Sequence, residues 1–456
     1  MRDDFANRVS RRALNRRDFL WLLSLSTVSM ALPGCAVDPV TGKKQLVLMS
    51  EEQEIALDRQ QSPHQFSMDY GACQDKELNA YISGLGMAVA ATSHRPDMPY
   101  SFRGVNAAYV NAYAFPGGSI AVTRGILAEL QNEAELAALL GHEIGHVNAR
   151  HTAERMTKGT LLQVALAGGS AYLGSGEYAN YSPYLETIGG LGASALLASY
   201  SRDDEREADR LAVQYMVAAG HNPDGMEGLM NVLVAKSKHT PNALELMFAT
   251  HPMSRERLDN TRELTARHYA DERQRNVRRQ RYMDNTASVR RLKPVLLKLQ
   301  DGAGSMAAKK FSEAEMAFAT ALDQAPDDYA ALLMMAKCKM ALKKNAEARR
   351  YARQARNIYP GEAQAVQISG ISALADKKFS VAYEEFDRYD TLLPGNGQVT
   401  FLKGISLDGM GKKEMAAKHY QAYLQAVSQG EAAAHARRRL TSWGYINAGD
   451  AKGRRQ

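Results

Sequence analysis

The sequence predicts a mainly α-helical protein in two parts: a helical domain with a small edge β-sheet, and after it an α-solenoid of repeated helix pairs. Three observations support this fold class. A His-Glu-x-x-His pentapeptide lies inside a helical pattern at 133–150, a tight turn leads into a short apolar strand at 119–123, and small residues and prolines recur every 34 residues after position 293. At 456 residues, the chain is long enough for more than one domain.

The first 35 residues have the features of an export signal. Residues 15–20, NRRDFL, are similar to a twin-arginine signal, and the apolar segment 19–32 is too short for a conventional membrane span. Residues 32–35, LPGC, resemble a bacterial lipoprotein box, which implies that Cys35 becomes a lipid-bearing first residue and anchors the protein to the outer membrane, in the periplasm. The alternative is a plain signal peptide that is cut near Cys35 and releases the product.

A short strand is predicted after the turn Pro116-Gly117-Gly118. At the edge of a sheet, its free amides can align an extended peptide, because β-augmentation grips the main chain and tolerates many side chains. The alternative is a buried structural strand, and the two interpretations differ in whether the outer amides are free. The strand residues are Ser119, Ile120, Ala121 and Val122.

The pentapeptide at 142–146, HEIGH, predicts a zinc site with a general base. Four residues are slightly more than one helical turn, so His142 and His146 project from one face and can hold one Zn²⁺ through imidazole nitrogens. Glu143 lies beside the metal, where its carboxylate can take a proton from the water that attacks a peptide carbonyl. The alternative is an ordinary amphipathic helix that binds nothing.

A third ligand is expected from a second helical segment that begins near Ser201. Glu205 and Asp209 are four residues apart and share a face, so Glu205 can bind the metal while Asp209 accepts a hydrogen bond from the free ring nitrogen of a ligating histidine. Glu207 points elsewhere on the helix and is left out of the predicted site. Alone, the stretch also fits a solvated, charged helix start; together with the pentapeptide it favours one zinc ion per chain.

The two motifs together resemble those of the M48 metallopeptidases, in which the glutamate of Glu205-x-x-Ala208-Asp209 is the third zinc ligand. The resemblance implies a zincin-type metalloprotease domain at 50–270 and a zinc endopeptidase activity. Three further segments are similar to family elements that lead into the edge strand, continue the active-site helix and follow both motifs: 111–120, 147–151 and 250–252.

His251 lies on neither predicted helix. By resemblance, it is a removable fourth ligand, a latch that holds the enzyme latent. Catalytic zinc keeps an open position for water or substrate, so a permanent fourth histidine would abolish activity and this one must move. His251 could instead donate a hydrogen bond in the transition state, or be a structural histidine before Pro252.

The segment 161–200 lies between the two motifs and is rich in glycine, alanine and leucine. Its glycines interrupt every apolar run, so that none reaches the length of about 20 residues that spans a bilayer. We expect a mobile lid or plug over the cleft, with ordinary core helices as the alternative.

The carboxy-terminal part has a period of 34 residues, which resembles that of tetratricopeptide repeats and predicts four repeats in a domain at 293–442. Such an array offers a concave groove for peptides or partner proteins, and a rigid spacer is the alternative. A helical linker is expected at 271–292 and a flexible tail at 443–456. The period is set by Pro326, Pro360 and Pro394, by Ala314, Ala348, Ala382 and Ala416, and by Gly302, Ala336, Gly370 and Gly404.

The composition is that of an ordinary globular protein, with 45% hydrophobic and 23% charged residues. The net charge of +7 includes the basic signal region, and no basic motif with interleaved aromatic residues appears, so we do not expect nucleic-acid binding. Cys73 and Cys338 form no recognisable disulfide framework.

The order of signal, M48 domain and tetratricopeptide array resembles a branch of the family that works in the periplasm on outer-membrane β-barrel proteins. The resemblance implies unfolded or stalled outer-membrane proteins as substrates, with the repeats binding these or the barrel assembly machinery. The competing hypothesis is a tetratricopeptide chaperone or adaptor with a structural or latent zinc site. Glu143 favours the enzyme, because a structural zinc site has no use for an unligated carboxylate beside the metal.

Overall fold

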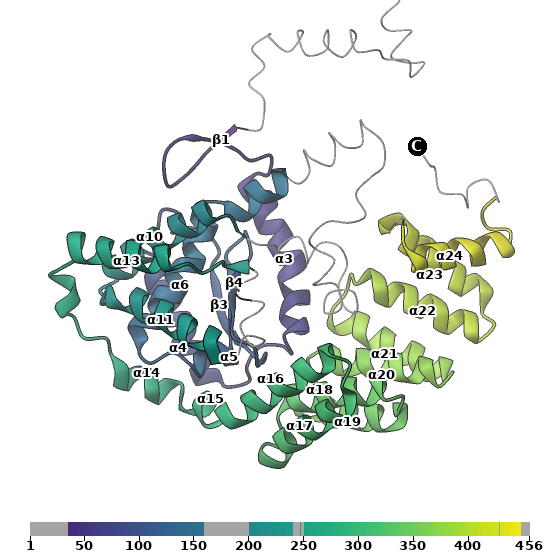
Figure 1. Ribbon diagram of the computed structural model, residues 1–456. Helices are drawn as coiled ribbons and strands as arrows, with labels where there is room; N and C mark the ends of the chain where they lie inside the picture. The colour runs from purple at the N-terminus through teal and green to yellow at the C-terminus, as the bar shows by residue number, and fades with distance from the viewer. Residues whose placement is uncertain (1–34, 159–199, 240–246, 248–249, 428, 448–456) are drawn as a thin grey trace, which may run out of the picture.

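The computed structural model describes residues 35–158, 200–239, 247, 250–427 and 429–447 (Figure 1). Within these ranges the chain is mainly α-helical, with one three-stranded sheet and one two-stranded hairpin, which confirms the predicted fold class. The predicted signal peptide up to residue 34, residues 161–199 of the predicted lid and the tail from residue 448 lie outside the described part. No helix of that part is both long and apolar enough to cross a membrane.

The amino-terminal domain is built around helix α6 (Glu133–Asn148), all of whose residues are buried. Asn132 caps the helix by accepting a hydrogen bond from the backbone N–H of Glu135. In Figure 1, α6 lies in the middle of the domain, in contact with α4, α10, α11 and β4. The other elements are β1 (Cys35–Val37), β2 (Lys44–Leu46), α3 (Glu51–Met68), α4 (Lys76–Ala90), β3 (Ser101–Val105), β4 (Ala112–Ala114), β5 (Ser119–Thr123), α5 (Arg124–Leu127), α10 (Arg202–Ala218), α11 (Asp224–His239) and α13 (Arg255–His268).

Helices α6 and α10 approach closely because small residues meet where they pack. A Cβ on Gly141 would lie 3.1 Å from the backbone oxygen of Ala212, and a Cβ on Gly145 would lie 3.2 Å from the Cα of Ala208. Larger side chains at these glycines would push the helices apart, because a close-packed interior cannot absorb the extra volume. The close approach brings the acidic residues of α10 to the histidines of α6.

The three-stranded sheet has the order β3-β5-β4. Strand β5 pairs in parallel with β3 and antiparallel with β4, so it is the central strand. The prediction that residues 119–122 form an exposed edge strand is therefore wrong. Ile120, Ala121 and Val122 are buried, and the backbone of β5 is paired on both sides. The edge strand that contacts α6 is β4, in the segment expected only to lead into the edge.

The carboxy-terminal part consists of antiparallel helix pairs, as the 34-residue period predicts. A short helical stretch precedes it, with η3 (Glu272–Gln274), α14 (Arg279–Asn285) and α15 (Ala287–Arg291). The repeat helices are α16 (Lys293–Ala307), α17 (Phe311–Gln324), α18 (Tyr329–Ala341), α19 (Asn345–Ile358), α20 (Gln364–Ala375), α21 (Phe379–Leu392), α22 (Gly397–Gly409), α23 (Lys413–Ala426) and α24 (Glu431–Ser442).

Glycines at the crossing point within a repeat make room for an aromatic ring of the second helix. A Cβ on the glycine would lie 2.2 Å from the ring for Gly302 and Phe318, 2.7 Å for Gly370 and Phe386, and 2.7 Å for Gly404 and Tyr420. The second repeat differs, because Ala336 and Ala352 stand at the corresponding positions and pack in one core cluster, so that two small residues take the place of the glycine and the ring.

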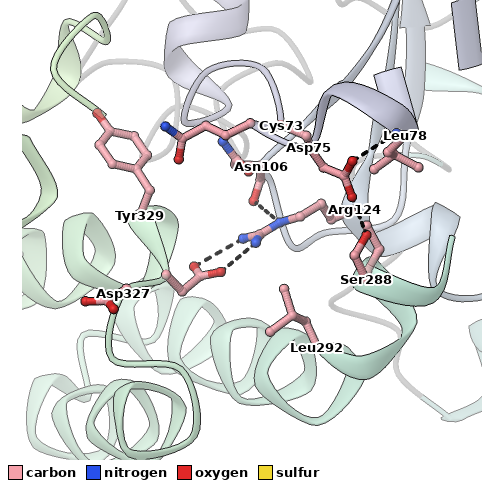
Figure 2. A pocket seen from close by; sticks show the side chains of 12 residues that line it. Cys73, Asp75, Leu78, Asn106, Arg124, Ser288, Leu292, Asp327 and Tyr329 are labelled. Carbon is pink, nitrogen blue, oxygen red and sulfur yellow. Dashed lines mark hydrogen bonds and ion pairs between the residues drawn. The ribbon is translucent and has the colours of Figure 1, made fainter. Parts of the chain in front are cut away.

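The repeat array is fixed to the amino-terminal domain by buried polar contacts. Figure 2 shows Arg124, at the start of α5, in a pocket that Tyr329 of α18 also lines. Arg124 forms an ion pair with Asp328, which caps α18. The Arg124 Nη1 and Nη2 atoms lie 2.5 and 3.2 Å from the two Asp328 carboxylate oxygens, and Nε donates to the backbone oxygen of Asn106 at 3.0 Å. Nearby, Ser67 and Tyr329 both donate to the carboxylate of Glu362. These contacts hold the first repeats against the sheet and α3.

Candidate metal centre

His142 and His146 on α6 meet Glu205 on α10 in one buried cluster. The Nε2 atoms of the two histidines are 3.1 Å apart, and the Glu205 carboxylate oxygens lie 3.5 Å from His142 Nε2 and 3.4 Å from His146 Nε2. Donor atoms of these residues and of His251 all lie within 4.8 Å of one another. One ion at the centre is within reach of every donor, and two imidazoles with a carboxylate suit catalytic zinc, so these residues fit the metal.

Glu143 lies beside this cluster and is 1% exposed. Neither of its carboxylate oxygens has a hydrogen-bond partner among the described residues, and burial raises its pKa. Its Oε1 atom lies 3.8 Å from His251 Nε2, too far for a hydrogen bond. A buried carboxylate without partners is costly, and such groups are found where chemistry requires them.

Two of the three predicted ligands, His146 and Glu205, favour the protonation states that a metal ion needs. Burial lowers the pKa of His146 well below its usual range, which favours the neutral imidazole. Burial acts to raise the pKa of Glu205, but the surrounding histidines outweigh it and hold this pKa well below its usual range. Metal binding needs neutral imidazoles and an ionised carboxylate, and His146 and Glu205 already favour these states. For His142, burial acts to lower the pKa, but the hydrogen bonds to Asp209 and Glu205 outweigh it and raise this pKa to about 10. A metal ion at the centre would therefore have to displace a proton from His142.

Asp209 holds His142 and is itself held by Arg257. One carboxylate oxygen of Asp209 lies 3.0 Å from His142 Nδ1. Arg257, in the first turn of α13, donates to both oxygens of Asp209 at 2.7 Å, and its Nη1 lies 2.6 Å from Glu205 Oε2. The guanidinium therefore fixes one ligand and the carboxylate behind another. Arg257 could not be predicted from the sequence, because only the fold brings α13 to α10.

His251 lies inside the cluster rather than at its border. Its Nδ1 atom is 2.9 Å from Glu205 Oε1 and 3.4 Å from His142 Nε2, and the residue is 3% exposed. Its backbone N–H donates to the backbone oxygen of Met247 at 2.6 Å. The side chain is therefore placed where a fourth ligand would be.

Two further residues contact His146, a third contacts one of these, and none of the three has a predicted role in the metal centre. The ring of Tyr200 stacks on that of His146, with centroids 3.8 Å apart and planes 16° apart. His151 lies 2.8 Å from the Nδ1 atom of His146, and Glu207 lies 3.4 Å from His151. The only sequence signal was proximity: His151 follows the pentapeptide by one turn, and Glu207 lies between Glu205 and Asp209.

Comparison with known proteins identifies both parts of the chain. Residues 74–265 match the model of peptidase family M48, and residues 305–368 match a tetratricopeptide repeat. The chain is 30% identical to the beta-barrel assembly-enhancing protease of Yersinia pestis over 192 residues. This aligned region is 41% of this chain and 39% of the relative. It is 33% identical to the mitochondrial metalloendopeptidase OMA1 of Arabidopsis thaliana over 173 residues, an aligned region that is 37% of this chain and 32% of the relative.

A shorter relative is covered further. The metalloprotease YcaL of Escherichia coli (strain K12) is 28% identical over 191 residues, which is 42% of this chain and 70% of the relative. By comparison, the aligned regions cover only about two fifths of the length of the beta-barrel assembly-enhancing relatives. The matched region contains the pentapeptide, Glu205 and His251, and the repeats follow it. The chain therefore carries a peptidase family M48 domain followed by tetratricopeptide repeats.

Proposed function

We propose that this chain is a zinc-dependent endopeptidase in which His142, His146 and Glu205 bind one Zn²⁺ and Glu143 is the general base. The observation that carries the proposal is the buried, unpartnered carboxylate of Glu143 beside three metal-binding side chains. A chaperone or adaptor with a structural metal would gain nothing from this carboxylate and would bear its desolvation cost.

The residues of the site divide the chemistry among them. Zinc, when bound, supplies a Lewis acid for the scissile carbonyl and the attacking water. Glu143 takes the proton from the water as it attacks the carbonyl carbon, and then delivers that proton to the leaving amine. Asp209 and Arg257 keep His142 and Glu205 in place throughout.

Strand β4 is the edge to which we assign the substrate. The N–H of Phe115 donates to Ser119 and the N–H of Thr123 donates to Asn111, so residues 111, 113 and 115 face β5. The amides of Ala112, which is buried, and of Ala114, which is partly exposed, point away from β5. No other strand of the described residues pairs with this outer side. An extended peptide can pair there, next to α6, whatever its side chains.

The biological setting is part of the proposal. The name of the Yersinia pestis relative motivates unfolded or stalled outer-membrane β-barrel proteins as substrates, with the repeats binding these or the assembly machinery. The lipoprotein box at Cys35 supports a periplasmic protein anchored to the outer membrane. We retain the boundaries 1–35, 50–270, 271–292, 293–442 and 443–456 for signal, protease domain, linker, repeats and tail.

The test of the proposed function is proteolysis by the purified chain. We expect zinc-dependent cleavage of an unfolded model protein and of an assembly-stalled barrel protein, loss of cleavage on chelation, and recovery when Zn²⁺ is added back. Binding of both substrates with zinc present and without any cleavage, also by His251→Ala, would instead support the chaperone hypothesis.

His251→Ala tests the latch. If His251 occupies the position that substrate needs, only a minor open population is active, and removing the imidazole should raise the cleavage rate roughly tenfold or more. A transition-state donor would behave in the opposite way, because its loss slows the reaction. Peptide cleavage rates at saturating substrate distinguish the two, with His64→Ala on α3 as the control. An unchanged rate would rule out both roles.

A further inference from the structure

We propose that His151 is a positioning residue of the metal centre, which orients the ring of His146 and connects it to the carboxylate of Glu207. The inference rests on the proposed function, since it concerns the zinc site of the same enzyme. His151 lies outside the pentapeptide and outside the Glu205 motif, and it contacts a predicted ligand rather than the metal position itself.

The contact itself is short and buried. The Nδ1 atoms of His146 and His151 are 2.8 Å apart, and the exposed fractions of these residues are 1% and 3%. His151 lies just beyond α6, and Arg150 before it adopts a left-handed backbone with φ of 57°. This turn reverses the chain enough to bring the imidazole back against the ligand one helical turn earlier.

The two rings can bond in only one way when His146 binds a metal through Nε2. A neutral imidazole that ligates through Nε2 carries its proton on Nδ1, so His146 must donate and His151 must accept at its own Nδ1. His151 then carries its proton on Nε2. That atom lies 3.4 Å from Glu207 Oε2 and 4.0 Å from Asp204 Oδ1, so Glu207 is the nearer acceptor.

The bond to His151 selects between two ring orientations that stacking alone does not distinguish. Tyr200 stacks on the face of His146, which holds the plane of the ring, but a half-turn flip about the Cβ–Cγ bond keeps that plane and exchanges the ring nitrogens with ring carbons. The bond selects one of the two, because only one orientation of the ring brings Nδ1 to the acceptor and Nε2 to the metal. An imidazole held in this way loses less freedom on binding the ion.

Helix α10 thereby supports both histidines as well as supplying a ligand. Glu205 faces the metal position, Asp209 contacts His142 directly, and Glu207 contacts His146 through His151. A ligating histidine normally donates its second N–H to a carboxylate or a carbonyl. His142 follows that rule directly, and His146 follows it through a second imidazole.

Zinc affinity of the full chain, measured by competition with a coloured chelator, tests the proposal without relying on catalysis. His151→Leu removes the acceptor and should weaken zinc binding roughly 10–100-fold. His151→Asn keeps an oxygen near the position of Nδ1 and should recover most of the affinity. His221→Leu, at a histidine that is also 3% exposed but lies outside the cluster, is the matched control and should bind zinc as the wild type does.

A double variant tests the connection to Glu207. Glu207→Leu should weaken zinc binding by a smaller factor, and adding it to His151→Leu should cause no further loss, because the second bond exists only through the first. Additive losses would overturn the connection, and wild-type affinity in His151→Leu would overturn the positioning role.

Failure of the proposed function gives a different result. The endopeptidase proposal is contradicted if the wild-type protein binds no zinc, or if it binds zinc and neither it nor the His251→Ala variant cleaves any substrate. Unchanged zinc affinity in His151→Leu contradicts only the role of His151. Should His151→Leu fail to fold, Glu207→Leu decides, because the Glu207 side chain is 28% exposed and its loss leaves the core intact. Wild-type affinity in that variant would then overturn the inference.

Discussion

Glu143→Gln is expected to abolish cleavage and to leave zinc binding unchanged. Glutamine has the shape of glutamate but cannot take a proton from water, and positioned acid–base groups contribute roughly 10²–10⁴-fold to a rate. Glu143 is 1% exposed and makes no hydrogen bond within the described residues, so the substitution breaks no contact. It should even relieve the cost of burying a charge. Cleavage rate, zinc content and thermal stability of the purified variant check the three expectations.

The matched control is Glu135→Gln on the same helix. Glu135 is also buried, at 5% exposure, but it accepts hydrogen bonds from the backbone N–H of Gln131 and the side chain of Asn132, away from the metal cluster. We expect it to keep its cleavage activity. If Glu143→Gln lost its zinc, Glu143 would be a ligand rather than a base, and if it kept full activity the mechanism would need another base.

The local parts of the site could be predicted from the sequence because helix geometry is local. His142 and His146 share a face of α6, and Glu205 and Asp209 share a face of α10, for the same reason of four-residue spacing. What brings the two helices together is also visible in part, since Gly141, Gly145, Ala208 and Ala212 are small. The repeats could be predicted because their crossing points recur at fixed intervals.

The parts that failed depend on tertiary pairing. Over five residues, the sequence pattern of a buried strand resembles that of a half-buried edge strand. Strand β5 is central only because β3, from earlier in the chain, pairs with its other side. Arg257 and His151 are ordinary residues in the sequence and acquire their roles because α13 and the turn after α6 fold against the cluster. Glu207 points away from the metal position, as its place on the helix predicts, and for that reason it can reach His151 instead.

Asp328→Asn is expected to lower the free energy of unfolding by about 3–5 kcal/mol, because removing one partner of a buried ion pair leaves the other charge uncompensated. The side chains of Arg124 and Asp328 are 7% and 4% exposed. Asparagine can still accept the capping hydrogen bond that Asp328 receives from the backbone N–H of Ala331. The loss therefore reports the ion pair, and Asp328→Ala should cost about 1 kcal/mol more through the lost cap.

The pH dependence of this difference has a defined sign. Burial acts to raise the pKa of Asp328, but the Arg124 charge and its hydrogen bonds outweigh it, so the folded-state pKa lies below the usual 3.8. A carboxyl whose pKa is depressed on folding contributes stability that is present above its unfolded pKa and is lost as pH falls through the folded value. Denaturant unfolding of wild type and Asp328→Asn should therefore differ at neutral pH and converge in strong acid.

Two comparisons separate the ion pair from a general effect of lost charge. Asp301→Asn, in a surface pair with Lys298 on α16, should change stability little, because both side chains remain solvated. Adding Arg124→Met to Asp328→Asn should recover part of the loss, since the unpaired charge is then removed. Wild-type stability in Asp328→Asn would mean that water reaches Arg124 and that this pair does not hold the array. A loss of stability of the expected size would show that the repeats are attached at α5, directly after the central strand β5 of the protease domain.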